Sequence, residues 1–186
     1  VLADADVDAS NLALLLHPAA AASVPFIGGE LAFVDPDACN GCGSCVHFCR
    51  FDAIEMEAGE IFPSAQVNEL RCEGCAVCTL ICPRGAISMR DEVSGNWTLS
   101  SGDTGPLAFA HLGVRGENSG RLVTQVRKVA SEAAVQAEAA MLIIDGPPGT
   151  GCPVISAITG VDTVVMVTEP TPPGLSDLNR VLALAE

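Results

Sequence analysis

Eight of the nine cysteines in this 186-residue chain fall in two identically spaced groups. One group spans residues 39–49 and the other spans residues 72–82, and both have the spacing C-x2-C-x2-C-x3-C. The similarity extends past the last cysteine of each group, because residues 52–54 (DAI) align with residues 85–87 (GAI). A repeat of this kind indicates two copies of one small unit, folded against each other about a pseudo-twofold axis.

The spacing within each group fits thiolate ligation of a cubic [4Fe–4S] cluster. Three cysteines separated by two residues each can bind one cluster from a single tight loop, whereas the fourth starts a helical turn and points toward the other cluster. The sequence therefore predicts a crosswise division of the eight ligands. One cluster is held by Cys39, Cys42, Cys45 and Cys82, and the other by Cys72, Cys75, Cys78 and Cys49.

Other uses of these cysteines fit the pattern less well. Zinc ribbons use pairs of cysteines and have no use for a third and fourth at this spacing. Disulfides would need an oxidising compartment, and the chain shows no signal peptide. The stretch resembles the bacterial two-cluster ferredoxins, except that Arg50 stands where the first motif usually carries proline. The expected small core that shields the clusters consists of Phe51, Ile54, Met56, Ile61, Phe62, Ile81 and Ile87.

The composition excludes several classes of partner. A net charge of −14 argues against binding to nucleic acid or to an anionic membrane through a basic face. No apolar run approaches the ~20 residues of a membrane span. Eight cysteines used as cluster ligands indicate a reducing cytoplasm, and the remaining Cys152 is expected to be a small packed residue.

The segments on either side of the cysteine repeat have the pattern of an α/β domain. Residues 1–3 have the pattern of the end of a buried strand, and apolar positions in 119–133 recur with helical spacing. Residues 140–144 form a continuous apolar run, typical of a strand buried on both faces of a parallel sheet. A second such strand is expected at 164–167, joined to the first by a right-handed crossover.

Acidic residues follow two of the expected strands. Asp4, Asp6 and Asp8 come at the carboxyl end of the first strand, where open α/β sheets place their ligands, although aspartate is equally common in turns and helix caps. The loop 145–151 opens like a phosphate-binding P-loop, but Cys152 stands where that loop needs lysine. An aspartate delivered by an apolar strand next to glycine and proline fits a magnesium-side loop instead, with a purely structural turn as the alternative.

Together these segments resemble the MinD/ParA/Mrp group of P-loop ATPases, and the cysteine repeat resembles the ferredoxin domain inserted in some of its members. The pattern D-x-D-x4-N-L at 4–12 looks like the second conserved loop of the group, IIDGPPGTGCPV looks like its switch loop, and TEPTPPGLSDL looks like the segment that follows. The resemblance implies a mostly parallel P-loop NTPase sheet with helices on both faces, interrupted by an α+β ferredoxin-like domain. The nucleotide-hydrolase domain would comprise 1–26 and 93–186, incomplete at both ends, and the insert 27–92.

The resemblance also implies roles for single residues. Asp6, with Asp4 beside it, would lie near magnesium and the attacking water of ATP hydrolysis. Asp145 would bind the magnesium shell through water, Gly149 would approach the γ-phosphate, and Asn11 would support the switch region. The glycine-rich lysine loop of the group would precede the first residue, so the fragment alone is expected to be inactive as an ATPase.

The favoured hypothesis is an ATPase that couples ATP binding and hydrolysis to electron transfer through two [4Fe–4S] clusters. One alternative is a ferredoxin-type electron carrier whose ATPase portion is only a scaffold, and another is an ATPase of iron–sulfur cluster assembly, as in the Mrp branch. The expected cofactors are two [4Fe–4S] clusters, with ATP and Mg²⁺ in the full-length protein. The expected partners are a redox protein and a second copy of the chain in a nucleotide-dependent homodimer.

Overall fold

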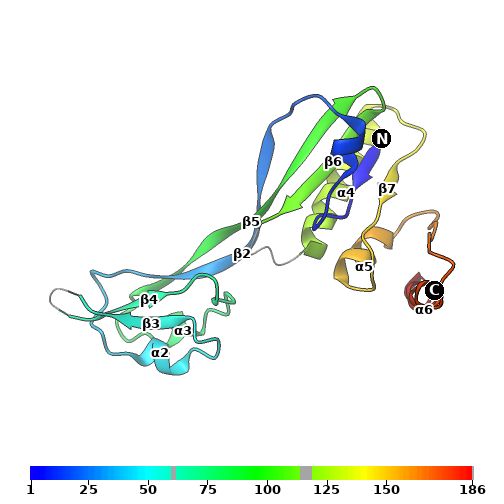
Figure 1. Ribbon diagram of the computed structural model, residues 1–186. Helices are drawn as coiled ribbons and strands as arrows, with labels where there is room; N and C mark the ends of the chain where they lie inside the picture. Colours follow the sequence, from blue (N-terminus) through cyan, green and yellow to red (C-terminus); the bar gives the residue numbers. More distant parts are fainter. Residues whose placement is uncertain (60–61, 114–118, 186) are drawn as a thin grey trace. The chain divides into compact units, whose positions relative to one another are not determined.

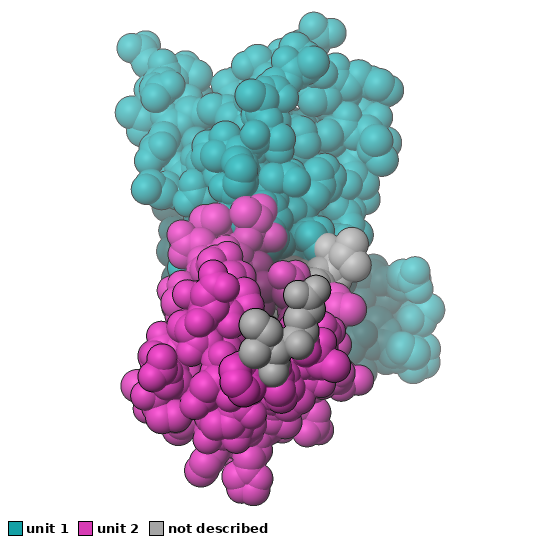
Figure 2. Space-filling view, turned by 90° about the vertical axis from the view of Figure 1, so that its left-hand side faces the viewer, with its two compact units in different colours: residues 1–26, 94–186 teal, residues 27–93 magenta. Residues whose placement is uncertain are grey.

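The computed structural model describes residues 1–59, 62–113 and 119–185 (Figure 1). The chain divides into two compact units (Figure 2). Unit 1 comprises Val1–Phe26 and Ser94–Glu186, and unit 2 comprises Ile27–Val93. Unit 2 thus covers nearly the same residues as the expected insert, and the biochemical identity of each domain stays a prediction.

Within the described residues the helices range from 5 to 18 residues and the strands from 3 to 16. None of the helices in the described ranges is long and apolar enough to cross a membrane. In chain order the elements are β1 (Leu2–Asp4), α1 (Leu12–Leu16), β2 (Ser23–Val34), α2 (Ser44–Phe48), β3 (Ile54–Glu57), β4 (Ser64–Val67), α3 (Val77–Ile81), β5 (Ile87–Gly102), β6 (Gly105–Leu112), α4 (Ser119–Gln136), β7 (Ile143–Asp145), α5 (Cys152–Ile158) and α6 (Pro172–Ala185).

The larger sheet has the strand order β2-β5-β6-β1-β7. β1 pairs in parallel with both β6 and β7, whereas β5 and β6 are antiparallel. The α/β class is confirmed, but the sheet is mixed rather than mostly parallel. The physical reason lies in the connection between β5 and β6, since Gly102 pairs with Gly105 across a tight turn and strands joined in this way must run in opposite directions.

The core of unit 1 lies between β1, β6 and α4. Ala3, Ala108 and Ala110 are fully or almost fully buried, and α4 packs on both strands. The predicted helical spacing in this segment is confirmed, because its apolar positions form the buried face of α4. These buried helix residues are Leu122, Val123, Val126, Val129, Ala130 and Ala133.

Two expected strands differ from the structure. β7 covers only Ile143–Asp145 at the edge of the sheet, and the Ile143 side chain is exposed. Residues 164–167 form no strand, and Val165 and Val167 are 81% and 92% exposed. The predictions of a strand buried on both faces and of a second strand after a crossover are therefore wrong for this structure. An apolar run becomes a buried strand only where a neighbouring strand and covering layers are present.

Unit 2 has its own core, which lies around an antiparallel β3–β4 pair. Ile54 and Ile87 are buried as expected, together with Ala32, Ala65 and Cys45. The other five expected core residues are not buried in this core or lie outside the described residues. Phe51, Met56 and Phe62 are exposed, Ile81 is half-buried, and Ile61 lies outside the described ranges.

Candidate metal centre

The two cysteine groups adopt the same backbone conformation. α2 (Ser44–Phe48) and α3 (Val77–Ile81) begin and end at positions 33 residues apart, which is the offset of the sequence repeat. Three pairs of residues at this offset have left-handed backbone conformations. The pairs are Gly41 and Gly74 (φ 69° and 61°), Gly43 and Ala76 (φ 70° and 59°), and Asp52 and Gly85 (φ 49° and 61°).

The left-handed residues let each loop curl so that its first three cysteines face one space. At Gly41 the loop also passes so close to the backbone of Pro63 that a Cβ atom would overlap the Pro63 carbonyl oxygen. A Cβ atom at Gly74 would overlap the carbonyl oxygen of Glu30 in the same way. Glycine is needed at these two positions because of both the backbone angle and the close approach.

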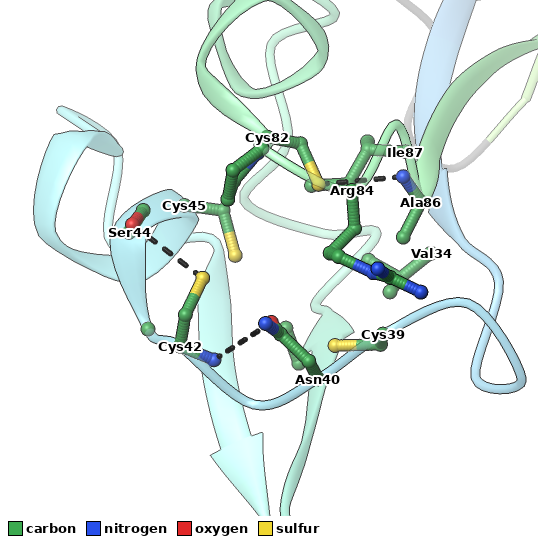
Figure 3. Close-up of a pocket in the computed structure, with 13 residues that line it drawn as sticks. Val34, Cys39, Asn40, Cys42, Ser44, Cys45, Cys82, Arg84, Ala86 and Ile87 are labelled. Atoms are coloured by element: carbon green, nitrogen blue, oxygen red, sulfur yellow. Dashed lines mark hydrogen bonds between the residues drawn. The ribbon is translucent and has the colours of Figure 1, made fainter.

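Each set of four cysteines that the spacing assigned to one cluster lines its own pocket. The first pocket has an empty volume of about 330 Å³ that includes open solvent, and Figure 3 shows its four sulfur atoms around a common space. The second pocket has a corresponding volume of about 720 Å³. We call the two sets the first cysteine site (Cys39, Cys42, Cys45 and Cys82) and the second cysteine site (Cys72, Cys75, Cys78 and Cys49).

The fourth cysteine of each motif reaches the other motif's pocket because it follows a one-turn helix. Cys49 ends α2 and Cys82 ends α3, both with extended backbone (φ −73°, ψ 115° and φ −72°, ψ 112°). The Cys49 Sγ accepts a hydrogen bond from the Ala53 N–H at 3.4 Å, and the Cys82 Sγ accepts one from the Ala86 N–H at 3.3 Å. These two bonds fix the position of each sulfur at the end of its helix.

One thiol in each site has a raised pKa. Burial raises the pKa of Cys45 and of Cys78, and the neighbouring thiolates of the same site raise both further. All nine cysteines are free, so no disulfide competes for these sulfurs. Several thiols crowded around one space are unfavourable as thiolates until a cation neutralises them, which is the situation that iron in a cluster provides.

The spacing of the ligand side chains differs from that of a site for a single metal ion. In the described part of the chain, no three His, Cys, Asp or Glu side chains gather closely enough to hold one metal ion. A tetrahedral zinc site needs its sulfurs about 2.3 Å from one point. The fit to a larger inorganic cluster comes from the four sulfurs that surround each pocket.

In unit 1, the first predicted nucleotide residue has a well-defined structural role. Asp4 is almost fully buried, and its Oδ2 accepts hydrogen bonds from the Ser10 hydroxyl at 2.8 Å and from the Asn11 and Leu12 N–H groups at 2.9 Å. Its Oδ1 accepts the Asp6 N–H at 3.2 Å. Asp4 thus stabilises the turn before α1, which is the capping alternative left open by the sequence.

Asp145 lies opposite Asp4 because the two residues are register partners at the carboxyl ends of the parallel strands β7 and β1. The pKa of Asp145 is raised, first by burial and then by the charge of Asp4. The pKa of Asp6 is also raised, mainly by burial, with Asp4, Asp8 and Asp145 adding to the effect and the Ala9 backbone opposing it. The predicted carboxylates therefore come together as one electrostatically coupled group.

The other two predicted nucleotide residues lie in the adjoining loops. Asn11 is exposed and immediately precedes α1, and its N–H is one of the donors to Asp4. Gly149 follows β7 with φ 95°, and open space surrounds the position where a Cβ atom would stand. Their roles toward a nucleotide stay predictions. Sequence reasoning missed Ser44 and Arg84, which line the first cysteine site, although both lie within two residues of a cysteine of that site.

The family match among the comparisons with known proteins lies within unit 2. Residues 32–89 match the family of 4Fe–4S dicluster domains, and the match includes all eight repeated cysteines. A 44-residue stretch is 48% identical to an iron–sulfur subunit of the CoB–CoM heterodisulfide reductase of Methanopyrus kandleri, covering 20% of this chain and 7% of that protein.

Two relatives come from Methanocaldococcus jannaschii. The uncharacterized protein MJ0578 is 34% identical over 183 residues, which are 98% of this chain and 61% of that protein. The uncharacterized protein MJ0579 is 31% identical over 84 residues, 45% of this chain and 30% of that protein. The chain thus spans about three-fifths of the length of the first relative. These comparisons give no support to a P-loop ATPase, so that part of the interpretation stays a prediction, whereas they confirm iron–sulfur cluster binding as the role of the segment 32–89.

Proposed function

We propose that the chain is an electron-transfer protein in which the first and second cysteine sites each hold one [4Fe–4S] cluster. The observation that carries this proposal is the division of eight cysteines between two pockets, four sulfurs to each. When bound, each cluster supplies a site that accepts and releases one electron. Because all eight ligands come from one chain, the clusters are permanent cofactors rather than cargo for transfer.

The protein's own residues would make both sites suited to this task. The left-handed loops present three sulfurs to each site, and the Ala53 and Ala86 amides hold the fourth sulfur in place. One core cluster of unit 2 includes Cys45 of the first site and packs against Cys72 and Cys78 of the second. The two sites therefore belong to one packed unit, as electron exchange between them requires.

The test is metal analysis of anaerobically purified chain together with single cysteine variants. We expect about eight irons and about two electron equivalents per chain. Cys49→Ser and Cys72→Ser should leave the same residual cluster spectrum, whereas Cys82→Ser should leave the other. Cys152→Ser is the matched control and should keep the full iron content. Zinc in place of iron, or a Cys49→Ser spectrum that matches Cys82→Ser, would contradict the proposal.

A second candidate function adds nucleotide-dependent control by unit 1. The supporting observation is the coupled carboxylate group of Asp4, Asp6 and Asp145 at the carboxyl ends of adjacent parallel strands. In this proposal Asp145 binds the water shell of Mg²⁺, Asp6 lies near the attacking water, and Asp4 positions Asp6 through the hydrogen bond to its amide. Catalysis of phosphoryl transfer also depends on phosphate-binding groups beyond these carboxylates.

ATP turnover by the full-length protein, with its clusters oxidised and then reduced, tests this second proposal. Coupling predicts different rates in the two redox states and a loss of turnover in Asp145→Asn. Identical rates in both states would leave the clusters as an electron carrier without coupled ATPase activity. No turnover at all would remove the nucleotide role of unit 1.

A further inference from the structure

The two cysteine sites have the same backbone but different surroundings. Because equivalent positions lie 33 residues apart, each residue that lines one pocket can be compared with its counterpart in the other. Several of these pairs differ in polarity or charge. The pairs, first site before second, are Ser44 and Val77, Asn40 and Glu73, Pro83 and Arg50, and Arg84 and Phe51.

The hydroxyl of Ser44 contacts a ligand sulfur of the first site. The Cys42 Sγ and Ser44 Oγ atoms lie 3.5 Å apart (Figure 3). Once the sulfur is a ligand thiolate it has no proton to give, so the Ser44 hydroxyl must be the donor of this hydrogen bond. The counterpart at the second site, Val77, has no polar group in its side chain that could donate such a bond.

The charges around the two sites also differ. Arg84 is the one charged side chain that lines the first pocket within the described residues, and its guanidinium group lies at the edge of the pocket on the side of Val34 (Figure 3). The second pocket is lined by Arg50 and by Glu73, whose charges cancel. The net lining charge is therefore +1 at the first site and zero at the second. All three side chains are exposed, so salt screens their effect.

One hydrogen bond at the first site acts in the opposite direction, because it does not stabilise the reduced state of a cluster there. The Cys42 N–H donates to Asn40 Oδ1 at 3.3 Å, so this amide is engaged with a side chain instead of with a cluster sulfur. A hydrogen bond directly to a ligand thiolate acts on a charged acceptor and outweighs a long bond between neutral groups. Hydrogen bonds to the sulfurs and net positive charge both stabilise the more negative, reduced state of an iron–sulfur cluster.

We propose that the first cysteine site has the higher reduction potential, so that a single electron entering unit 2 resides mainly at that site. Ser44 and Arg84 stabilise this reduced state. This inference rests on the proposed function, since it needs a cluster at each site. The internal step transfers one electron: the second site is oxidised from [4Fe–4S]¹⁺ to [4Fe–4S]²⁺, and the first is reduced from [4Fe–4S]²⁺ to [4Fe–4S]¹⁺. No proton moves and no bond is made or broken.

The experiment is an anaerobic redox titration of the whole chain with dithionite as the one-electron donor, followed by electron paramagnetic resonance. Wild-type chain should show two midpoint potentials. Ser44→Ala should lower the higher one, changing the distribution of the electron between the sites about tenfold, which for one electron corresponds to about 59 mV. Val77→Ser, the matched variant at the exposed equivalent position, should raise the lower midpoint and leave the higher one in place.

The charged residues give a second measurement with a different signature. Arg84→Gln should lower the higher midpoint, and Glu73→Gln should raise the lower one. Both shifts should shrink as salt is added, whereas the Ser44→Ala shift should persist, because a direct hydrogen bond is not screened.

A single wild-type midpoint, a Ser44→Ala shift confined to the lower midpoint, or a Val77→Ser shift confined to the higher midpoint would overturn the inference. Iron content separates this failure from a failure of the proposed function. About eight irons per chain with equal potentials refutes only the inequality of the sites. Substantially less iron in the wild-type chain refutes the two-cluster proposal itself. A Ser44→Ala chain that loses iron leaves Val77→Ser and Arg84→Gln to decide.

Discussion

Two glycines of the first ligand loop differ in what lies next to them, and this difference predicts unequal effects of the same substitution. Gly41 and Gly43 have almost the same left-handed angle, φ 69° and 70°. An added methyl group at Gly43 meets nothing within 4 Å, whereas at Gly41 it would overlap the carbonyl oxygen of Pro63 and lie 3.1 Å from the Pro63 Cγ. Alanine already occupies the equivalent of Gly43 in the second loop, where Ala76 has φ 59°.

Both substitutions carry the left-handed penalty of about 1–2 kcal/mol for a residue with a Cβ atom. Gly41→Ala adds an overpacking cost of about 2 kcal/mol, because the neighbour that must move is backbone. Cluster loss requires this loop to open, so Gly41→Ala should lose its iron about 30-fold faster than Gly43→Ala. The assay is the decay of the visible cluster absorbance when anaerobic protein is mixed with an iron chelator. Equal decay rates for the two variants would refute the argument from close approach.

Three further predictions concern unit 1 and use the fluorescence of Trp97, the one tryptophan, to follow unfolding in urea. Asp4→Asn should lower the free energy of unfolding by about 2 kcal/mol, because a buried carboxylate that accepts several N–H and O–H bonds is replaced by a partly donating amide; an unchanged midpoint would contradict the capping role. Leu122→Ala should lower it by about 3 kcal/mol, because Leu122 is fully buried, whereas Val135→Ala at an exposed position of the same helix should stay within about 0.5 kcal/mol of wild type. Asp145→Asn should lessen the fall in stability as pH rises above about 4. The folded-state pKa of Asp145 lies above the unfolded value, so the fold favours the protonated carboxyl. The destabilisation is therefore absent below the unfolded pKa of about 4 and develops as pH rises through the folded pKa. Equal pH dependence in Asp145→Asn and wild type would show that this carboxylate does not contribute.

The cysteine sites could be predicted in detail because their geometry is local. Ligand spacing of two and three residues allows only a tight loop followed by a helical turn, and the structure has that arrangement twice, at α2 and α3. The helical period that places Leu122 and Val126 on one face of α4 is equally local. The size of the unit 2 core was harder to foresee, because Phe51 and Met56 have apolar side chains but lie at its surface.

The structural role of Asp4 could not be predicted from the sequence pattern. An aspartate after a strand fits both a metal ligand and a helix cap, and the choice depends on which N–H groups the following turn brings to its oxygens. The structure brings the Ser10 hydroxyl and the Asn11 and Leu12 amides to them. Likewise, the polarity of each cysteine site depends on Ser44 and Arg84, whose positions near ligands were visible but whose approach to a particular pocket was not.

By itself, the sequence determined which side chains can bind metal, how they divide into two groups, and which segments repeat, since these properties follow from residue type and from spacing along a covalent chain. Only the tertiary structure decided that the antiparallel pairing of β5 with β6 makes the sheet mixed, that Val164, Val165 and Val167 stay exposed, and which polar groups surround each set of sulfurs. Those outcomes depend on contacts between residues that are distant in the chain. Such contacts decide which strand pairs with which, which apolar residues are covered, and which donors reach a given acceptor. The local sequence pattern contains no information about these contacts.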